Sequence, residues 1–254
     1  MAKKETEKKN EEVIETLVQT LSEAPAQEET ETLEAAPATM FSYGLGELMV
    51  MEDLDSRIFY LDEEVSEDTF RNLTMFIIKK NVEDANIPVE QRVPIKIVIN
   101  CYGGDVFNGL GLVDVIRESI TPVFTVVIGY ACSMAFYVAA LGDMRFAMPN
   151  SIFLNHDGQT FIGNSSSKFR DEVKFFDRID ERLDKMLASR SKLTIKQIQD
   201  EKRVEQYMFA DEAKDLGVID YIIGEDIDFE EIFGAPVQCE CEECHGDCDG
   251  KKES

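Results

Sequence analysis

One stretch, residues 123–157, constrains the fold more than any other part of this 254-residue chain. It begins with a β-branched run, Val123 to Ile128, which is typical of a buried strand. Small residues follow up to Ser133, and the apolar run Met134 to Leu141 predicts a buried helix that starts at this serine. A second strand-like run then leads to His156. A serine at a strand-to-helix junction and a histidine at a strand end are the residue types of a nucleophile and its base.

The rest of the chain alternates expected strands with expected helices. The strands are expected at 57–61, 95–100, 123–128 and 151–154, and the helices at 66–80, 107–116, 134–141, 168–190 and from 208 to a stop at Gly217. This alternation predicts βαβ units and an α/β fold with a mostly parallel sheet. Functional groups collect at the carboxyl ends of such strands, which is where Gly103-Gly104, Ser133 and His156 fall.

The charge distribution restricts the expected partners. The formal net charge is −25, of which residues 1–40 carry −6, residues 225–254 carry −9 and the middle carries −10. An acidic surface repels phosphate backbones, so we expect no nucleic acid partner. No run approaches the ~18 apolar residues of a membrane span, and no apolar core follows the basic N-terminus as in a signal peptide. We therefore expect a cytoplasmic protein without a membrane partner.

The composition predicts three regions: an acidic disordered tail at 1–40, one folded domain at 41–224 and an acidic, cysteine-rich tail at 225–254. Residues 13–21 of the first tail fit a short amphipathic helix, so the alternative to a solvated tail is a docking element. A removable pro-segment is a separate alternative. The second tail offers zinc ligands, because Cys239, Cys241, Cys244 and Cys248 lie beside His245. Unstructured, redox-sensitive thiols are the alternative. Cys101 and Cys132 lie in apolar segments and are expected to be buried free thiols.

The long helix expected at 168–190 has an apolar stripe and a densely charged remainder. One interpretation is a helix that packs on its own core. Because the helix is longer than average, the other interpretation is that it projects and packs on a partner subunit.

The junction residues could form a hydrolytic site. A serine hydroxyl needs a base to take its proton, and a neutral imidazole is suited to this near pH 7. The oxyanion then needs N–H donors, for which the backbone N–H groups of Gly104 and Met134 are candidates. The alternatives are that Ser133 is only a helix N-cap and that His156 is only a packed or solvated residue.

Several motifs, in order along residues 54–223, resemble the ClpP family, the proteolytic subunit of the caseinolytic Clp proteases. They are DSRIFYL at 55–61, INCYGG at 99–104, GYACSMA at 129–135, MPNS through His156 at 148–156, and FADEA to LGVID at 209–220. The resemblance implies a ClpP/crotonase-like fold of repeated ββα and βαβ units with a protruding long helix. It also implies Ser133 as nucleophile, His156 as base and the Gly104 and Met134 N–H groups as the oxyanion hole.

The third catalytic residue departs from the family pattern. The position of the family's aspartate falls on Glu205, and a glutamate can also orient an imidazole. If the alignment is shifted, Asp200 is the nearest aspartate upstream. No cofactor is required for this hydrolysis.

The family also implies an assembly: stacked, heptameric rings joined by the long helix, with unfolded protein substrates delivered to an inner chamber by an AAA+ unfoldase ATPase for protein quality control. One rival is a phage-type protease that matures capsid or scaffold proteins without an ATPase. A second is a catalytically silent ring subunit. A third is a hydratase of the related crotonase-like architecture, in which Ser133 and His156 have no role.

Overall fold

The computed structural model describes residues 53–158 and 165–234. Helices and strands alternate in them as the sequence predicts, which confirms the α/β fold class. The order is β1 (Ile58–Leu61), α3 (Glu67–Glu83), η1 (Val89–Gln91, a 3-10 turn), β2 (Ile95–Cys101), α4 (Val106–Arg117), β3 (Val123–Cys132), α5 (Met134–Ala140), β4 (Met144–Ala147), β5 (Ile152–Asn155), α6 (Ser166–Arg190), α7 (Ile195–Lys202), β6 (Gln206–Phe209), α8 (Ala210–Asp215), β7 (Tyr221–Ile222) and α9 (Phe229–Phe233).

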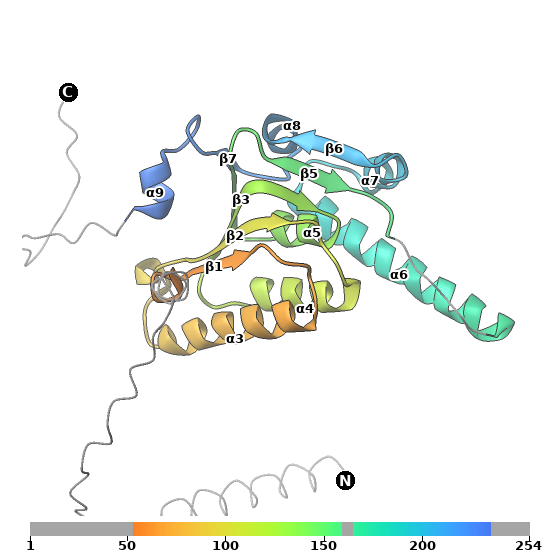
Figure 1. The fold of residues 1–254 in the computed structure, drawn as a ribbon, viewed down its shortest axis with the longest axis horizontal. Helices are drawn as coiled ribbons and strands as arrows, with labels where there is room; N and C mark the ends of the chain where they lie inside the picture. The colour runs from red at the N-terminus through yellow and green to blue at the C-terminus, as the bar shows by residue number, and fades with distance from the viewer. Residues whose placement is uncertain (1–52, 159–164, 235–254) are drawn as a thin grey trace, which may run out of the picture. The chain divides into compact units, whose positions relative to one another are not determined.

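A seven-stranded sheet forms the centre of the described fold (Figure 1). Strands β1, β2, β3, β4 and β7 are neighbours in that order, and each pair is parallel. Strand β3 changes partner along its length, because residues 124–127 pair with β4 and residues 130–132 pair with β5. Strand β6 pairs antiparallel with β5. The end of β3, which leads into Ser133, therefore lies beside the end of β5, which leads into His156.

Helices α3, α4 and α5 pack against one face of this sheet (Figure 1). Helix α3 begins after Ser66, whose hydroxyl accepts the N–H of Thr69 and so caps the helix as predicted. Helix α5 is buried at every position, which suits a helix that is apolar on all sides. The main core forms where these helices meet the β-branched residues of β2 and β3.

Helix α6 packs against the core from Phe176, which is partly buried, to its C-terminal end. Its residues Ile179, Leu183 and Leu187 are buried, whereas Phe169 and Val173 are exposed. The N-terminal half therefore extends beyond the sheet layer (Figure 1), which confirms a protruding long helix. Its contact with a partner subunit stays a prediction.

Strand β4 was not expected from the sequence, because Arg145 interrupts its apolar pattern. In the structure Arg145 is buried, and its guanidinium lies 2.6 Å from the Asp220 carboxylate. The same guanidinium donates to the carbonyls of Arg190, at 2.7 Å, and Gly217, at 2.9 Å. A buried charge is tolerated here because its partners come from distant parts of the chain.

Residues 225–234, expected as the start of the acidic tail, include helix α9. Its Ile232 is buried and joins Val126, Phe146 and Ile223 in a second, smaller core. The folded region thus continues about ten residues past 224.

Some expectations lie outside the described residues. They are the tail at 1–40 and the candidate zinc ligands Cys239, Cys241, Cys244 and Cys248 with His245. Within the described ranges, no helix combines the length and the apolar character that crossing a membrane requires.

Candidate active site

Ser133 occupies a strained turn between β3 and α5. Its backbone has φ 54° and ψ −124°, in the half of conformational space that residues other than glycine rarely adopt. It is the N-cap residue of α5, but its side chain makes no capping hydrogen bond. Its N–H donates to the carbonyl of Leu154 in β5 at 2.9 Å. The hydroxyl is thus not used for capping, which removes the simplest structural reason for a serine here.

The Gly103-Gly104 turn lies directly against this serine. A Cβ on Gly103 would lie 2.7 Å from the Ser133 Cβ and 2.8 Å from the Met134 nitrogen, so only glycine allows this approach. The turn is held by Val65, whose N–H donates to the Gly103 carbonyl at 2.8 Å. Within the described residues, neither the Gly104 nor the Met134 N–H donates a backbone hydrogen bond. Both predicted oxyanion donors are therefore available beside Ser133.

His156 directly follows β5, and Glu205 directly precedes β6. Asn155 of β5 is in register with Gln206 of β6. Because the two strands are antiparallel, His156 and Glu205 both lie at the same end of this pair, one position beyond its last paired residues. His156 is partly exposed, and Glu205 is exposed with φ 55°. The register therefore places the backbones of the predicted base and the predicted acid at one end of the strand pair, and the pairing of their side chains stays a prediction.

Asp200, the alternative acid, lies inside helix α7 rather than next to β6. It is exposed, and its carboxylate bonds the ammonium of Lys196 one turn earlier on the same helix. This hydrogen bond and the charge of Lys196 lower the pKa of Asp200. Its carboxylate is therefore already engaged on the helix, which favours Glu205 as the partner of His156.

A layer of buried polar groups underlies the histidine. The Tyr137 hydroxyl of α5 donates to the Asn155 Oδ1 at 3.2 Å, and both side chains are buried. Burial, together with the charges of Asp184, Asp180 and Asp157, raises the pKa of Tyr137, so this phenol stays protonated. The strand end before His156 is thus fixed by a hydrogen bond as well as by its ladder.

The two cysteines near the site are not rival nucleophiles. Cys101 and Cys132 are buried and free, as expected. Burial raises the pKa of both thiols, which keeps them protonated and weakly nucleophilic. Within residues 53–158 and 165–234, no group of three or more His, Cys, Asp or Glu side chains is arranged to hold a metal ion.

Two tyrosines lie close to the site along the chain. The rings of Tyr102 and Tyr130 lie with centroids 4.1 Å apart. Tyr102 precedes the Gly103-Gly104 turn and is largely exposed, and Tyr130 lies three residues before Ser133. This aromatic pair forms part of the surface that a ligand approaching Ser133 would meet.

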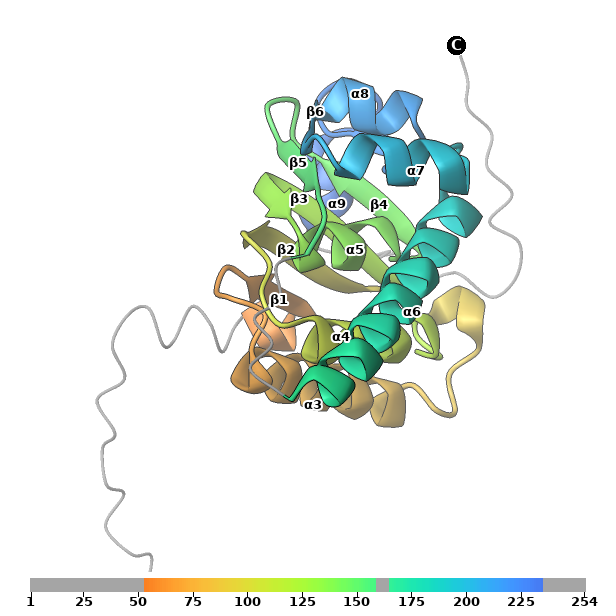
Figure 2. The ribbon, with the colours of Figure 1, turned by 90° about the vertical axis from the view of Figure 1, so that its right-hand side faces the viewer.

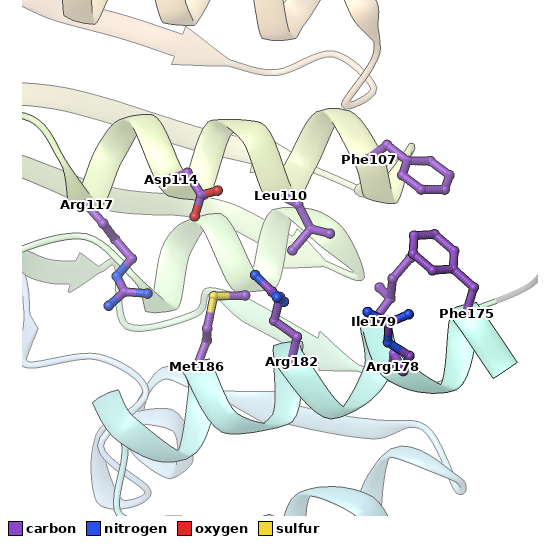
Figure 3. A pocket seen from close by; sticks show the side chains of 9 residues that line it. All are labelled: Phe107, Leu110, Asp114, Arg117, Phe175, Arg178, Ile179, Arg182 and Met186. Atoms are coloured by element: carbon purple, nitrogen blue, oxygen red, sulfur yellow. The ribbon is translucent and has the colours of Figure 1, made fainter. Parts of the chain in front are cut away.

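A cavity of about 410 Å³ lies between α4 and α6 (Figure 3). Its lining includes Arg117, Arg178 and Arg182, none of which forms an ion pair within the described part of the chain. Arg178 instead lies over the ring of Phe175, 5.8 Å from its centroid. The lining contains none of the catalytic candidates, so the cavity is not the reaction site.

Comparison with known proteins agrees with this geometry. The protein-family model described as Clp protease matches residues 48–226, which include every element from β1 to β7. The chain belongs to the Clp protease family. Relatives include the ATP-dependent Clp protease proteolytic subunit 3 of Streptomyces coelicolor, 28% identical over 204 residues, which are 78% of this chain and 86% of the relative. The subunit 3 of Parasynechococcus marenigrum is 30% identical over 172 residues, which are 66% of this chain and 82% of that protein.

Membership of the Clp protease family confirms the resemblance seen in the sequence motifs. The catalytic roles of Ser133, His156 and Glu205, and of the Gly104 and Met134 N–H groups, stay predictions. Sequence reasoning missed the buried polar groups beneath the site, including Tyr137. No local pattern could have revealed them, because their partners lie on other elements.

Proposed function

We propose that this chain is a serine endopeptidase of the Clp class, which hydrolyses peptide bonds of unfolded proteins through an acyl-enzyme. The observation that carries the proposal is the strained serine beside the Gly-Gly turn. Its hydroxyl is not used as a helix cap, and two N–H groups next to it have no backbone acceptor within the described residues. Strain of this kind is typical of functional sites.

In the proposed reaction, the Ser133 hydroxyl attacks the carbonyl carbon of the scissile peptide while His156 accepts its proton. The resulting oxyanion accepts hydrogen bonds from the Gly104 and Met134 N–H groups. When the tetrahedral intermediate collapses, the amine leaves with the proton from His156 and an ester remains on Ser133. Water, deprotonated by His156, then hydrolyses this ester and restores the serine.

Glu205 has the supporting role in this scheme. Its carboxylate accepts a hydrogen bond from the His156 ring, which fixes the ring orientation and stabilises the imidazolium. Glu205→Gln should therefore lower the rate constant by at least about 100-fold, whereas Glu205→Asp should keep a larger fraction of it. Equal activity of Glu205→Gln and the wild type would remove Glu205 from the mechanism.

The same proposal includes assembly into stacked heptameric rings, which work with a Clp-type ATPase in the cytoplasm. The names of the relatives, which describe ATP-dependent proteolytic subunits, support it. Exposed apolar residues also support it, because Met75, Ile78 and Val82 form a stripe along α3. A monomer would leave this stripe in water, whereas a ring of identical subunits would cover it.

A fluorophosphonate probe tests the chemistry directly. We expect the probe to label Ser133 in the native assembly and not to label Ser133→Ala, with the attachment site determined by peptide mass spectrometry. A native mass measurement on the same samples should give a multiple of seven subunits. Assembled protein without labelling would mean a catalytically silent ring subunit. Full protein hydrolysis without an ATPase would favour a maturation protease.

A further inference from the structure

Lys202, the last residue of α7, contacts both sides of the proposed catalytic pair through its backbone. Its carbonyl oxygen accepts the N–H of Asp157, the residue after His156, at 3.2 Å. The same oxygen accepts the N–H of Glu205 at 3.4 Å. One carbonyl therefore joins the backbone next to the proposed base to the backbone of the proposed acid.

The side chain of Lys202 anchors this carbonyl to helix α6. Its ammonium lies 3.1 Å from the Asp184 carboxylate, and the two side chains are only 8% and 1% exposed. The other oxygen of Asp184 accepts a hydrogen bond from Gln199 at 3.0 Å, so both carboxylate oxygens are used. Helices α6 and α7 pack against each other along this contact (Figure 2). A buried, fully bonded ion pair fixes position more tightly than a surface pair, which solvent weakens.

The charges around this ammonium are unbalanced. Asp157 and Asp180 lie 3.8 Å and 3.9 Å from it, so three carboxylates surround one cation. Burial raises the pKa of Asp180, as do the charges of Asp184 and Asp157, while Lys202 opposes this effect. Without the ammonium, these carboxylates would repel each other at the backbone that carries the catalytic pair.

We propose that Lys202 is a positioning residue that sets His156 and Glu205 in catalytic register, with its ammonium held by Asp184. The proposal rests on the proposed function, since it acts through that catalytic pair. It requires the positive charge rather than the bulk of the side chain. Misplacement of catalytic groups by about 1 Å costs on the order of 100-fold in rate, so the expected loss is large.

A mutant cycle tests this role. Lys202→Met should lower kcat for a fluorogenic peptide by about 10- to 100-fold and leave KM within about twofold, because the loss falls on the transition state. Lys202→Arg keeps the charge and should stay within about threefold of the wild type. In a Glu205→Gln background, Lys202→Met should cause a smaller loss than in the wild type, since Lys202 then positions only His156. Equal losses in both backgrounds would overturn the proposal.

Lys80 provides a matched control for the burial of a lysine. Its side chain is also 8% exposed, and its ammonium lies 3.0 Å from Glu83 on the same helix, α3. Lys80→Met should lower the melting temperature while kcat and KM stay at their wild-type values. An equal loss of kcat in Lys80→Met and Lys202→Met would overturn the proposal, because any buried lysine would then have the same effect.

Two further measurements keep the outcomes distinct. If Lys202→Met does not fold, Lys202→Met combined with Asp184→Leu replaces it in the cycle, because the pair then leaves no unpaired buried charge. Its kcat should fall as described, and wild-type kcat would overturn the proposal. Fluorophosphonate labelling of the wild type distinguishes a failure of the proposed function from a failure of the positioning role. Absence of label on Ser133 contradicts the proposed function, whereas normal labelling with an inert Lys202 contradicts only the positioning role.

Discussion

The backbone strain at Ser133 leads to a prediction that separates stability from catalysis. A residue with a Cβ at φ 54° and ψ −124° costs about 1–3 kcal/mol relative to a relaxed conformation. Glycine adopts this conformation freely, but it adds about 0.4–1 kcal/mol of conformational entropy to the unfolded chain. Ser133→Gly should therefore be more stable than Ser133→Ala by roughly 0.5–2 kcal/mol.

The comparison is made between these two variants because both lack the hydroxyl. For a domain of this size, 1 kcal/mol shifts the melting temperature by about 2–4 °C, so the expected difference is about 1–8 °C. Thermal unfolding at matched protein concentration and in the same oligomeric state measures it. Both variants should also fail to react with the fluorophosphonate probe.

Two results would refute this reasoning. If Ser133→Gly melts at or below the temperature of Ser133→Ala, the turn stores no strain. If either variant is labelled as fast as the wild type, the nucleophile is another residue. A stabilised, unreactive Ser133→Gly would show that the chain sacrifices stability to hold a serine at this position.

Three further predictions concern the residues around the site and the core. Gly103→Ala should abolish labelling of Ser133, since a Cβ there would lie 2.6 Å from the Cys132 carbonyl oxygen. A gel of protein treated with the fluorophosphonate probe measures the labelling, and normal labelling would contradict the close contact. Asp84→Asn should lower the free energy of unfolding in urea by about 3–5 kcal/mol, because Asp84 is buried and bonds the Arg57 guanidinium at 2.6 Å and 2.7 Å; unchanged stability would contradict this. The hydrogen bonding from Arg57 holds the pKa of Asp84 below its ordinary value. The stabilisation that the ionised Asp84 provides is therefore complete above about pH 5 and is lost as the pH falls through about 4 and below. Across that range, the wild type should lose more stability than Asp84→Asn. Arg145→Lys should cost about 2–3 kcal/mol in the same assay, because an ammonium cannot replace the guanidinium fork, and a neutral result would make that fork dispensable.

The regular elements could be predicted because their patterns are local. The β-branched run of β2, the cap at Ser66 and the apolar helix α5 each follow from a few neighbouring residues. Strand β4 could not be predicted in this way. Its Arg145 is acceptable in a buried strand only because Asp220, 75 residues later, provides the counter-charge.

The residues of the candidate site also divide into those that the local sequence predicts and one that requires the tertiary structure. The serine, the Gly-Gly turn and the histidine are marked by their places after strands, so the sequence predicts them as a group. The acid was ambiguous between Glu205 and Asp200, because both precede the same strand. The antiparallel register of β5 and β6 distinguishes them, and register depends on pairing between segments about 50 residues apart.

By itself, the sequence determined the α/β class, the family and the residue types available for catalysis. Periodicity, caps and glycine turns are short-range properties, so they can be read without knowing which segments meet. Only the tertiary structure decided that the Ser133 hydroxyl is not used as a helix cap and that Glu205 and His156 lie at the same end of the β5–β6 pair. It also decided that Lys202 is buried against Asp184. These features depend on distances between groups far apart in the chain, and chain folding alone sets those distances.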